Sequence, residues 1–305
     1  MPSDQSPEST DVSSEPREPL LPPTARPNSP TAIRALMRSL GLSPQKGFGQ
    51  NFLMSETVLR RIVAAGELQA SDVVIEVGPG LGHLTAQLIG LAGQVIAIEI
   101  DRGLVQRLRR IYAGTPNLEI VERDVLEIEP GELTGGRPYK VIANLPYYIT
   151  TAALRHFLER SALRPTLLVI MVQREVGDRL LARPGDLNLL AIGVQVFGRP
   201  RRVTRVPPNA FYPQPKVDSV VLRVDVYPEP RIASPPEKFF KVVSAGFAMS
   251  RKQLHNSLAQ RLWMPAGSAP VLLREIGIDP TRRPQTLTIE EWDKLTLELE
   301  RQGLV

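Results

Sequence analysis

Val73-Val-Ile-Glu-Val-Gly-Pro-Gly-Leu-Gly82 is the stretch that decides the fold. A run of β-branched residues passes directly into a glycine-rich turn, and a helical segment at 84–89 follows. Glycine at such a strand-to-helix turn lets backbone N–H groups approach a ligand closely. The spacing G-x-G-x-G departs from the dinucleotide fingerprint G-x-G-x-x-G. The stretch therefore predicts the first strand and the ligand loop of an α/β fold, with a turn that binds nothing as the alternative.

Downstream of this stretch, short β-branched runs alternate with helical segments, which is the signature of βαβ units and a parallel sheet. We expect five strands, at 73–77, 95–100, 118–121, 141–143 and 167–172. Two further β-like runs, 191–197 and 219–226, are joined by a Pro- and Arg-rich link and fit an antiparallel hairpin at one sheet edge. The expected fold is a Rossmann-like α/β sheet, mostly parallel, with an antiparallel edge hairpin.

Three regions are expected along the chain. Residues 1–30 contain eight prolines with Ser, Glu and Thr, too little apolar surface to offset chain entropy, and are expected to form a disordered tail. Residues 31–228 are expected to form the ligand-binding domain, opening with a helix at 31–40. Residues 229–305 are expected to form a small all-helical domain, with helices at 239–249, 254–263 and 271–276 and a last helix opened by the capping box Thr288 to Glu291.

The charge of the chain is unevenly distributed. The net charge is +5, and residues 1–30 hold two Arg against five acids, so the remaining residues carry +8. A basic body favours a nucleic-acid partner, because phosphate neutralisation dominates such affinities. The sequence shows neither a long apolar run nor a secretory signal, so we expect no membrane span and a cytoplasmic protein, with a monomer as the default.

Metal and thiol chemistry are not expected. The chain has no cysteine, which excludes disulfides, thiolate metal sites and cysteine nucleophiles. Its histidines, His83, His156 and His255, are far apart in the sequence and show no ligand spacing. The sequence therefore predicts no metal site.

Three acids follow the second and third expected strands. Glu99 and Asp101 end the second strand, where a carboxylate can accept hydrogen bonds from both ribose hydroxyls of an adenosine ligand, and we expect only one of the two to do so. Asp124 follows the third strand and offers an acceptor for an adenine amine. Each acid alone would be interpreted as a solvated side chain at the end of a strand, without a function. Because the three acids occur in order at the ends of successive strands, they predict a nucleoside site.

Asn144-Leu-Pro-Tyr147 follows the fourth strand, at the sheet edge where ligands bind. An exocyclic aromatic amine is a poor nucleophile because its lone pair is delocalised into the ring. The Asn144 side-chain oxygen and the Leu145 or Pro146 carbonyl could hold its two hydrogens and expose that lone pair to a methyl sulfonium. Tyr147 could stack on the base, and Phe211, in a proline-stiffened loop, offers a second aromatic. A proline turn with an exposed tyrosine, and a packed edge loop, are the structural alternatives.

Several segments together resemble the small-subunit ribosomal RNA adenine dimethyltransferases, the KsgA/RsmA family. The segments are Gln45-Lys-Gly-Phe-Gly-Gln-Asn-Phe-Leu53, 76–85, Glu99-Ile-Asp101, Asn144-Leu-Pro-Tyr-Tyr-Ile-Thr150, 211–219 and Arg251-Lys-Gln-Leu-His-Asn-Ser-Leu258. The match runs in order from about Ser43 to the C-terminus. Tyr148 departs from the Asn of many members.

This resemblance implies an S-adenosylmethionine-dependent methyltransferase that dimethylates two adjacent adenines in a terminal hairpin of small-subunit rRNA, late in ribosome assembly. By position it implies a cofactor site lined by Asn51, Leu53, Gly78, Glu99, Asp124 and Asn144. It also implies that Asn144, Tyr147 and Phe211 hold the target base. Candidate phosphate ligands for the rRNA are Arg199, Arg201, Arg202, Arg205, Arg251 and Lys252.

Three other functions fit parts of the sequence. A dimethyltransferase of large-subunit rRNA, of the antibiotic-resistance type, would share the fold and the chemistry, but the segments 211–219 and 251–258 favour the small-subunit enzyme. A non-catalytic RNA-binding assembly factor on the same scaffold would be expected to lose Gly78, Glu99 or Asn144, and all three are present. A nicotinamide oxidoreductase is opposed by the glycine spacing.

Overall fold

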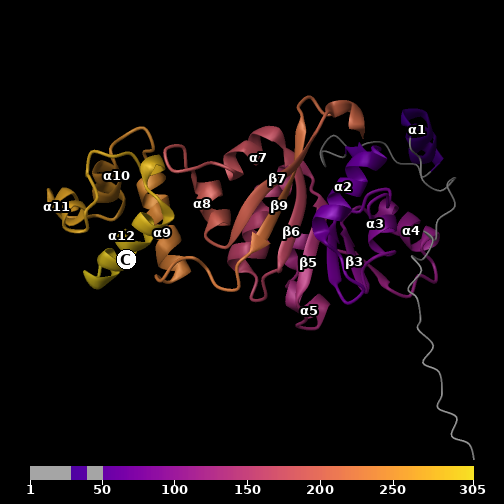
Figure 1. The fold of residues 1–305 in the computed structure, drawn as a ribbon, viewed down its shortest axis with the longest axis horizontal. Coiled ribbons are helices and arrows are strands. Elements are labelled where there is room, and N and C mark those ends of the chain that lie inside the picture. Colours follow the sequence, from indigo (N-terminus) through magenta and orange to yellow (C-terminus); the bar gives the residue numbers. More distant parts are fainter. Residues whose placement is uncertain (1–28, 40–50) are drawn as a thin grey trace, which may run out of the picture.

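The computed structural model describes residues 29–39 and 51–305. The tail expected at 1–30 lies outside these residues except for its last two, and so does the part of the family motif at 45–50. Among the described residues, seven strands form a central sheet in the order β4-β3-β2-β5-β6-β9-β7 (Figure 1). Their bounds are β2 Val73–Val77, β3 Gln94–Glu99, β4 Leu118–Glu122, β5 Tyr139–Asn144, β6 Leu167–Gln173, β7 Gly198–Val206 and β9 Ser219–Val226.

The first five strands of this order are parallel, and β9 runs antiparallel to both β6 and β7. The expected parallel strands are confirmed to within two residues at each end. The order β4-β3-β2-β5 reverses direction along the chain between β2 and β5, so a crevice opens at their carboxyl ends. The expected α/β sheet with an antiparallel edge is therefore confirmed.

Helices cover both faces of the sheet and continue beyond it. Their bounds are α1 Pro30–Ser39, α2 Glu56–Gly66, α3 Thr85–Leu88, α4 Arg102–Ile111, α5 Pro130–Thr134, α6 Thr150–Arg155, α7 Arg174–Leu180, α8 Leu189–Gln195, α9 Pro236–Phe247, α10 Leu254–Arg261, α11 Ser268–Glu275 and α12 Ile289–Arg301. Side chains of β2 alternate between two apolar clusters: Ile75 packs in one with Phe157, and Val74 packs in the other with Ile62 of α2. Burial on both faces explains why these strands read as continuous apolar runs.

The expected strand at 191–197 is wrong. That segment is mostly α8, whose first turn is capped by the Asn188 side chain, an acceptor for the Ala191 N–H at 3.0 Å. The edge strand is instead β7, the Pro- and Arg-rich segment that was expected to be a link. An edge strand needs no ladder bond on its outer side, so it tolerates Pro200 and a row of arginines that a central strand would exclude. The antiparallel pairing itself is confirmed, between β7 and β9.

A separate two-stranded sheet lies beside the main one. In it β1, Phe52–Leu53, pairs antiparallel with β8, Phe211–Tyr212. This pairing brings together two segments that are far apart in the sequence. Helix α1 packs Ile33 and Met37 against the same region, in a cluster that includes Phe52.

The C-terminal helices α9 to α12 extend from one edge of the sheet (Figure 1). Trp292 is the largest side chain of their core, and the capping box of Thr288 with Glu291 opens α12 as expected. Phe240 of α9 contacts Phe197, just after α8, with 5.9 Å between ring centroids. The apolar cluster is continuous from the sheet into these helices, and the domain boundary at 228–229 stays a prediction. Within the described ranges, no helix is both long and apolar enough to cross a membrane.

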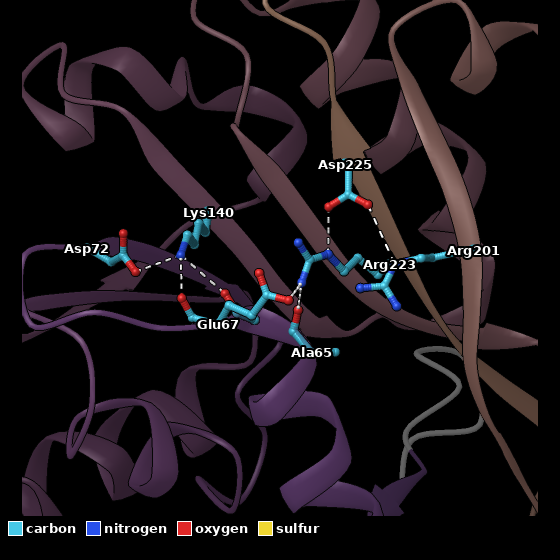
Figure 2. A network of polar contacts seen from close by, with 8 residues as sticks. Ala65, Glu67, Asp72, Lys140, Arg201, Arg223 and Asp225 are labelled. Atoms are coloured by element: carbon cyan, nitrogen blue, oxygen red, sulfur yellow. Dashed lines mark hydrogen bonds and ion pairs between the residues drawn. The ribbon is translucent and has the colours of Figure 1, made fainter.

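A polar network fixes the end of α2 to the sheet (Figure 2). Lys140 Nζ donates to the Glu67 carbonyl at 2.9 Å and contacts Asp72 Oδ2 at 2.7 Å. Arg223 donates from Nη1 to the Ala65 carbonyl at 2.8 Å and from Nε to Asp225 Oδ1 at 2.6 Å. Two cations thus satisfy carbonyls at the C-terminus of the helix, where backbone acceptors and partial negative charge gather.

Candidate active site at the carboxyl edge of the sheet

A cavity that is open to solvent lies at the carboxyl ends of β2, β3 and β5. Its walls come from the glycine turn after β2, from Glu99 and Ile100 after β3, from the segment 144–148 after β5, and from residues 51–53. Of the expected site residues, the cavity brings together Asn51, Leu53, Gly78, Glu99, Asn144 and Tyr147.

The glycine turn after β2 lines one side of this cavity. Gly78 has φ of +67° and Gly80 has φ of +57°, a left-handed conformation that residues with a Cβ rarely adopt. A Cβ at Gly80 would also lie 3.3 Å from the Phe52 ring. The helix that follows, α3, has only four residues, so the turn offers a ligand its close-lying backbone rather than a long helix dipole.

Glu99 and Asp101 differ in their position relative to the cavity. Glu99 is 7% exposed and accepts N–H hydrogen bonds from Gly80 at 3.2 Å and from Ile100 and Asp101 at 3.0 Å. Burial raises the pKa of the Glu99 carboxyl, and these backbone hydrogen bonds oppose the rise. Asp101 is the N-cap of α4 and accepts from the Gly103 and Leu104 N–H groups. Glu99 is therefore the acid of this pair that lines the cavity.

Asp124 does not line the cavity. It caps a short 3-10 helix, 125–127, and its Oδ1 accepts from the Leu126 N–H at 2.9 Å. Tyr148 connects it electrostatically to the site: burial raises the pKa of the Tyr148 hydroxyl, and the charges of Asp124 and Glu99 raise it further. A direct contact of Asp124 with a ligand in this cavity therefore stays a prediction.

Asn144 and Tyr147 belong to the cavity wall that follows β5. The Asn144 side-chain amide donates from Nδ2 to the Asn51 carbonyl at 3.3 Å. The Asn144 Oδ1 atom takes no part in that hydrogen bond. The Tyr147 hydroxyl lies 2.6 Å from the Ser219 hydroxyl at the start of β9, which fixes the direction of the ring. Burial raises the pKa of Tyr147, so the phenol stays neutral.

Phe211 is not in the cavity wall. It lies in β8, opposite Leu53 of β1, and its side chain is 1% exposed. A stacking role for Phe211 stays a prediction, and it requires the ring to leave this packed position.

Sequence reasoning assigned no role to Glu76, which lines the cavity and is 1% exposed. Burial raises the pKa of its carboxyl to about 8. Within the described residues, its Oε2 atom has no hydrogen-bond partner. The signal was present as one charged residue inside the apolar strand Val73–Val77. His83, also without an assigned role, lines the same cavity.

No group of three His, Asp or Glu side chains gathers in a metal-binding arrangement in the part of the chain that the structure describes. The polar groups that line the cavity include backbone N–H groups, the carboxyl groups of Glu76 and Glu99, and the side-chain amides of Asn51 and Asn144. This set suits an organic ligand with hydroxyl and amine groups.

The chain is similar to known proteins over most of its length. The family model of ribosomal RNA adenine dimethylases matches residues 41–300. A Ribosomal RNA small subunit methyltransferase A from Dehalococcoides mccartyi is 45% identical over 283 residues, covering 92% of this chain and 96% of its own. The protein of the same name from Pelotomaculum thermopropionicum is 43% identical and covers 87% and 94%.

Two solved structures extend the comparison to the fold. A dimethyladenosine transferase from Plasmodium falciparum superposes with a TM-score of 0.72 at 26% identity, covering 83% of this chain and 98% of its own. The 23S rRNA methyltransferase ErmE superposes with a TM-score of 0.65 at 29% identity, covering 82% and 100%. The family model spans the glycine turn, the Glu99 carboxylate and the Asn144 wall alike, and the chain belongs to the ribosomal RNA adenine dimethylase family.

Proposed function

We propose that the protein transfers methyl groups from S-adenosylmethionine to the N6 amine of two adjacent adenines in the terminal hairpin of small-subunit rRNA. One observation carries the proposal: the Asn144-Leu-Pro-Tyr147 turn shares a single cavity with the glycine turn and Glu99. Acceptors for an amine and a site for a nucleoside ligand are thus within reach of each other. The names of the relatives support the small subunit as the substrate.

The cofactor would occupy the side of the cavity formed by β2 and β3. Glu99 is placed to accept hydrogen bonds from the ribose hydroxyls, and the turn at Gly78 allows close approach of the amino-acid part. Asn51 and Leu53 would complete the wall, and Asp124 would accept the adenine amine. When bound, S-adenosylmethionine supplies an electrophilic methyl group on a sulfonium.

The chain contributes acceptors to the reaction rather than a strong base. Asn144 Oδ1 would accept a hydrogen bond from one amine N–H and a backbone carbonyl from the other, which orients the nitrogen lone pair toward the methyl group. As the N–C bond forms, the S–C bond of the donor would break, and the amine would lose one proton to water. The Pro146 carbonyl already accepts the Ile149 N–H at 3.1 Å, so Leu145 is the better candidate for the second acceptor. Alignment of this kind contributes about 7–11 kcal/mol in well-oriented reactions.

Tyr147 would stack on the target adenine. Removal of the adenine from the base stack of the RNA costs a few kcal/mol, and stacking on an aromatic side chain offsets about 1–3 kcal/mol of this cost. The hydrogen bond from Tyr147 to Ser219 holds the ring before the base arrives. Phe211 would be the second aromatic surface if β8 moves.

The exposed arginines of β7 would guide the rRNA to this edge. Arg201 and Arg202 already contact Asp225 and Asp178, whereas Arg199 and Arg205 have no acidic partner among the described residues. Val206 pairs with Ser219, so Arg205 lies near the Tyr147 end of the sheet. Arg251 and Lys252 would add contacts from the C-terminal helices. The enzyme would act in the cytoplasm, as a monomer, on pre-assembled small subunits.

The test is transfer of a tritiated methyl group from S-adenosylmethionine to undermethylated small subunits and, separately, to large subunits. We expect dimethyladenine in the small subunit only, and a loss of at least about 100-fold in rate for Asn144→Ala, since one of two oriented acceptors is removed. Label in the large subunit would indicate the resistance type of enzyme. Absence of label from both would favour a non-catalytic RNA-binding factor.

A further inference from the structure

Helix α10 ends at a bulky residue where glycine is usual. Its C-cap is Leu262, and the next residue, Trp263, has φ of +53°. The Met264 N–H donates to the Ala259 carbonyl at 3.0 Å, which is the long hydrogen bond of a Schellman ending. The left-handed position of this motif favours glycine, and a bulky side chain rarely adopts it. Helix termination therefore gives no reason for a tryptophan at this place.

The Trp263 side chain points into solvent. It is 91% exposed, the most exposed large apolar side chain among the described residues. Its neighbours Leu262 and Met264 are both buried and anchor the backbone on either side. The second tryptophan of the chain, Trp292, is completely buried. The fold thus presents one indole ring outward.

The segment of the sequence that contains Trp263 carries one sign of charge. Residues 238–274 contain no Asp or Glu and six cations: Lys238, Lys241, Arg251, Lys252, Arg261 and Arg274. Lys238 already contacts Glu300 of α12 at 2.9 Å. The exposed side of α10 carries the amides Gln253, Asn256 and Gln260, with Arg261 exposed at its end. Cations, hydrogen-bonding amides and a presented aromatic ring fit a phosphate backbone with an accessible base.

We propose that Trp263 is a stacking anchor for an unpaired base of rRNA, at a contact separate from the cavity at the carboxyl edge of the sheet. This inference rests on the proposed function, because rRNA is the nucleic acid on which such an enzyme acts. The anchor would take hold of the substrate at the C-terminal helices while the target adenine enters the cavity. A protein surface is the rival occupant, and the charge of residues 238–274 favours RNA over it.

Intrinsic fluorescence tests the contact directly. Protein-free small-subunit rRNA is added to the full chain while indole emission is followed, and Trp263→Phe assigns the signal, because only Trp292 then remains. We expect the RNA to quench the emission of Trp263 and to protect it from acrylamide, and to leave that of Trp292 unchanged. Emission of Trp263 that does not respond to bound RNA would overturn the proposal.

Methyl transfer to undermethylated small subunits gives the second measurement. Trp263→Ala should raise KM for the subunit by roughly 5-fold to 100-fold, the loss that one stacked base corresponds to, with kcat and the salt dependence unchanged. Trp263→Phe should keep KM within about 3-fold of the parent, because phenylalanine also stacks. Arg261→Ala is the matched control, and its salt dependence should become shallower.

The two measurements separate the outcomes. A raised KM for Trp263→Ala without quenching by protein-free rRNA would assign the ring to a ribosomal protein and overturn the RNA contact. Unchanged KM and unchanged fluorescence would overturn the anchor while the proposed function stands. If the parent protein methylated neither subunit, the proposed function would fail, and the fluorescence titration would still decide whether Trp263 binds RNA.

Discussion

Glu76 is a carboxyl group inside an apolar strand, and burial raises its pKa to about 8 from an ordinary 4.5. Below pH 4.5 the group is protonated whether the chain is folded or unfolded, so it costs no stability there. Between pH 4.5 and about 8 only the unfolded chain ionises it freely, so stability falls as pH rises and levels off above that range. We predict that Glu76→Gln, which cannot ionise, removes this fall. The difference in unfolding free energy between variant and parent should grow with pH, to at most about 5 kcal/mol.

Urea denaturation at a series of pH values measures this difference. Glu119→Gln serves as a control, because that strand residue is exposed and should shift the pH profile very little. A constant difference between Glu76→Gln and the parent across the range would show that Glu76 ionises equally well in the folded chain.

Single residues also show which parts of the candidate site could be predicted from the sequence. Gly78, Glu99 and Asn144 could be predicted to lie together, because the carboxyl ends of parallel strands meet at one edge. The burial of Phe211 fits the packed edge loop given as the alternative, but its partner Leu53 could not be predicted, because the two residues are far apart in the sequence. Glu76 was missed because a charge on a strand was read as part of the glycine motif rather than as a buried group.

At the scale of elements, α2 is held to the sheet by the network of Figure 2. We predict that Lys140→Met destabilises the protein by about 2 kcal/mol, because it leaves two helix-end carbonyls and the Asp72 carboxylate without a partly buried donor. The matched control is Lys294→Met, on the exposed side of α12, which should change stability by less than about 0.5 kcal/mol. The midpoint of denaturant unfolding measures both, and equal shifts would show that the network contributes nothing.

Elements also show where local patterns mislead. The parallel strands could be predicted because burial on both faces leaves continuous apolar runs. Segment 191–197 also contains β-branched residues, yet most of it belongs to α8, where Asn188 caps the first turn and all residues from Leu190 to Val194 are buried. β7 shows the reverse, since an edge position allows proline and arginine in a strand. Neither outcome can be derived from propensity without knowing which strand lies at the edge.

At the scale of the whole molecule, cations without an acidic partner among residues 29–39 and 51–305 extend from β7 to the segment just before α10. We predict that replacing Arg199, Arg205, Arg251 and Lys252 together by Ala flattens the slope of log affinity for rRNA against log salt by roughly three units. Replacing Arg201 and Arg202, which already contact carboxylates, should flatten it by less than one unit for each residue. Filter binding at a series of salt concentrations measures the slopes. An unchanged slope for the fourfold variant would place the RNA on another face.

The small sheet of β1 and β8 has a consequence for how the two ligands influence each other. One of its strands belongs to the wall of the expected cofactor site, and the other carries the aromatic residue expected to meet the base. If an entering base displaces β8, as the proposed role of Phe211 requires, β1 would move with it through their backbone hydrogen bonds. Binding of one ligand would then change the free energy of binding of the other, by the same amount in both directions. We therefore expect release of the spent cofactor and release of the methylated base to be linked events.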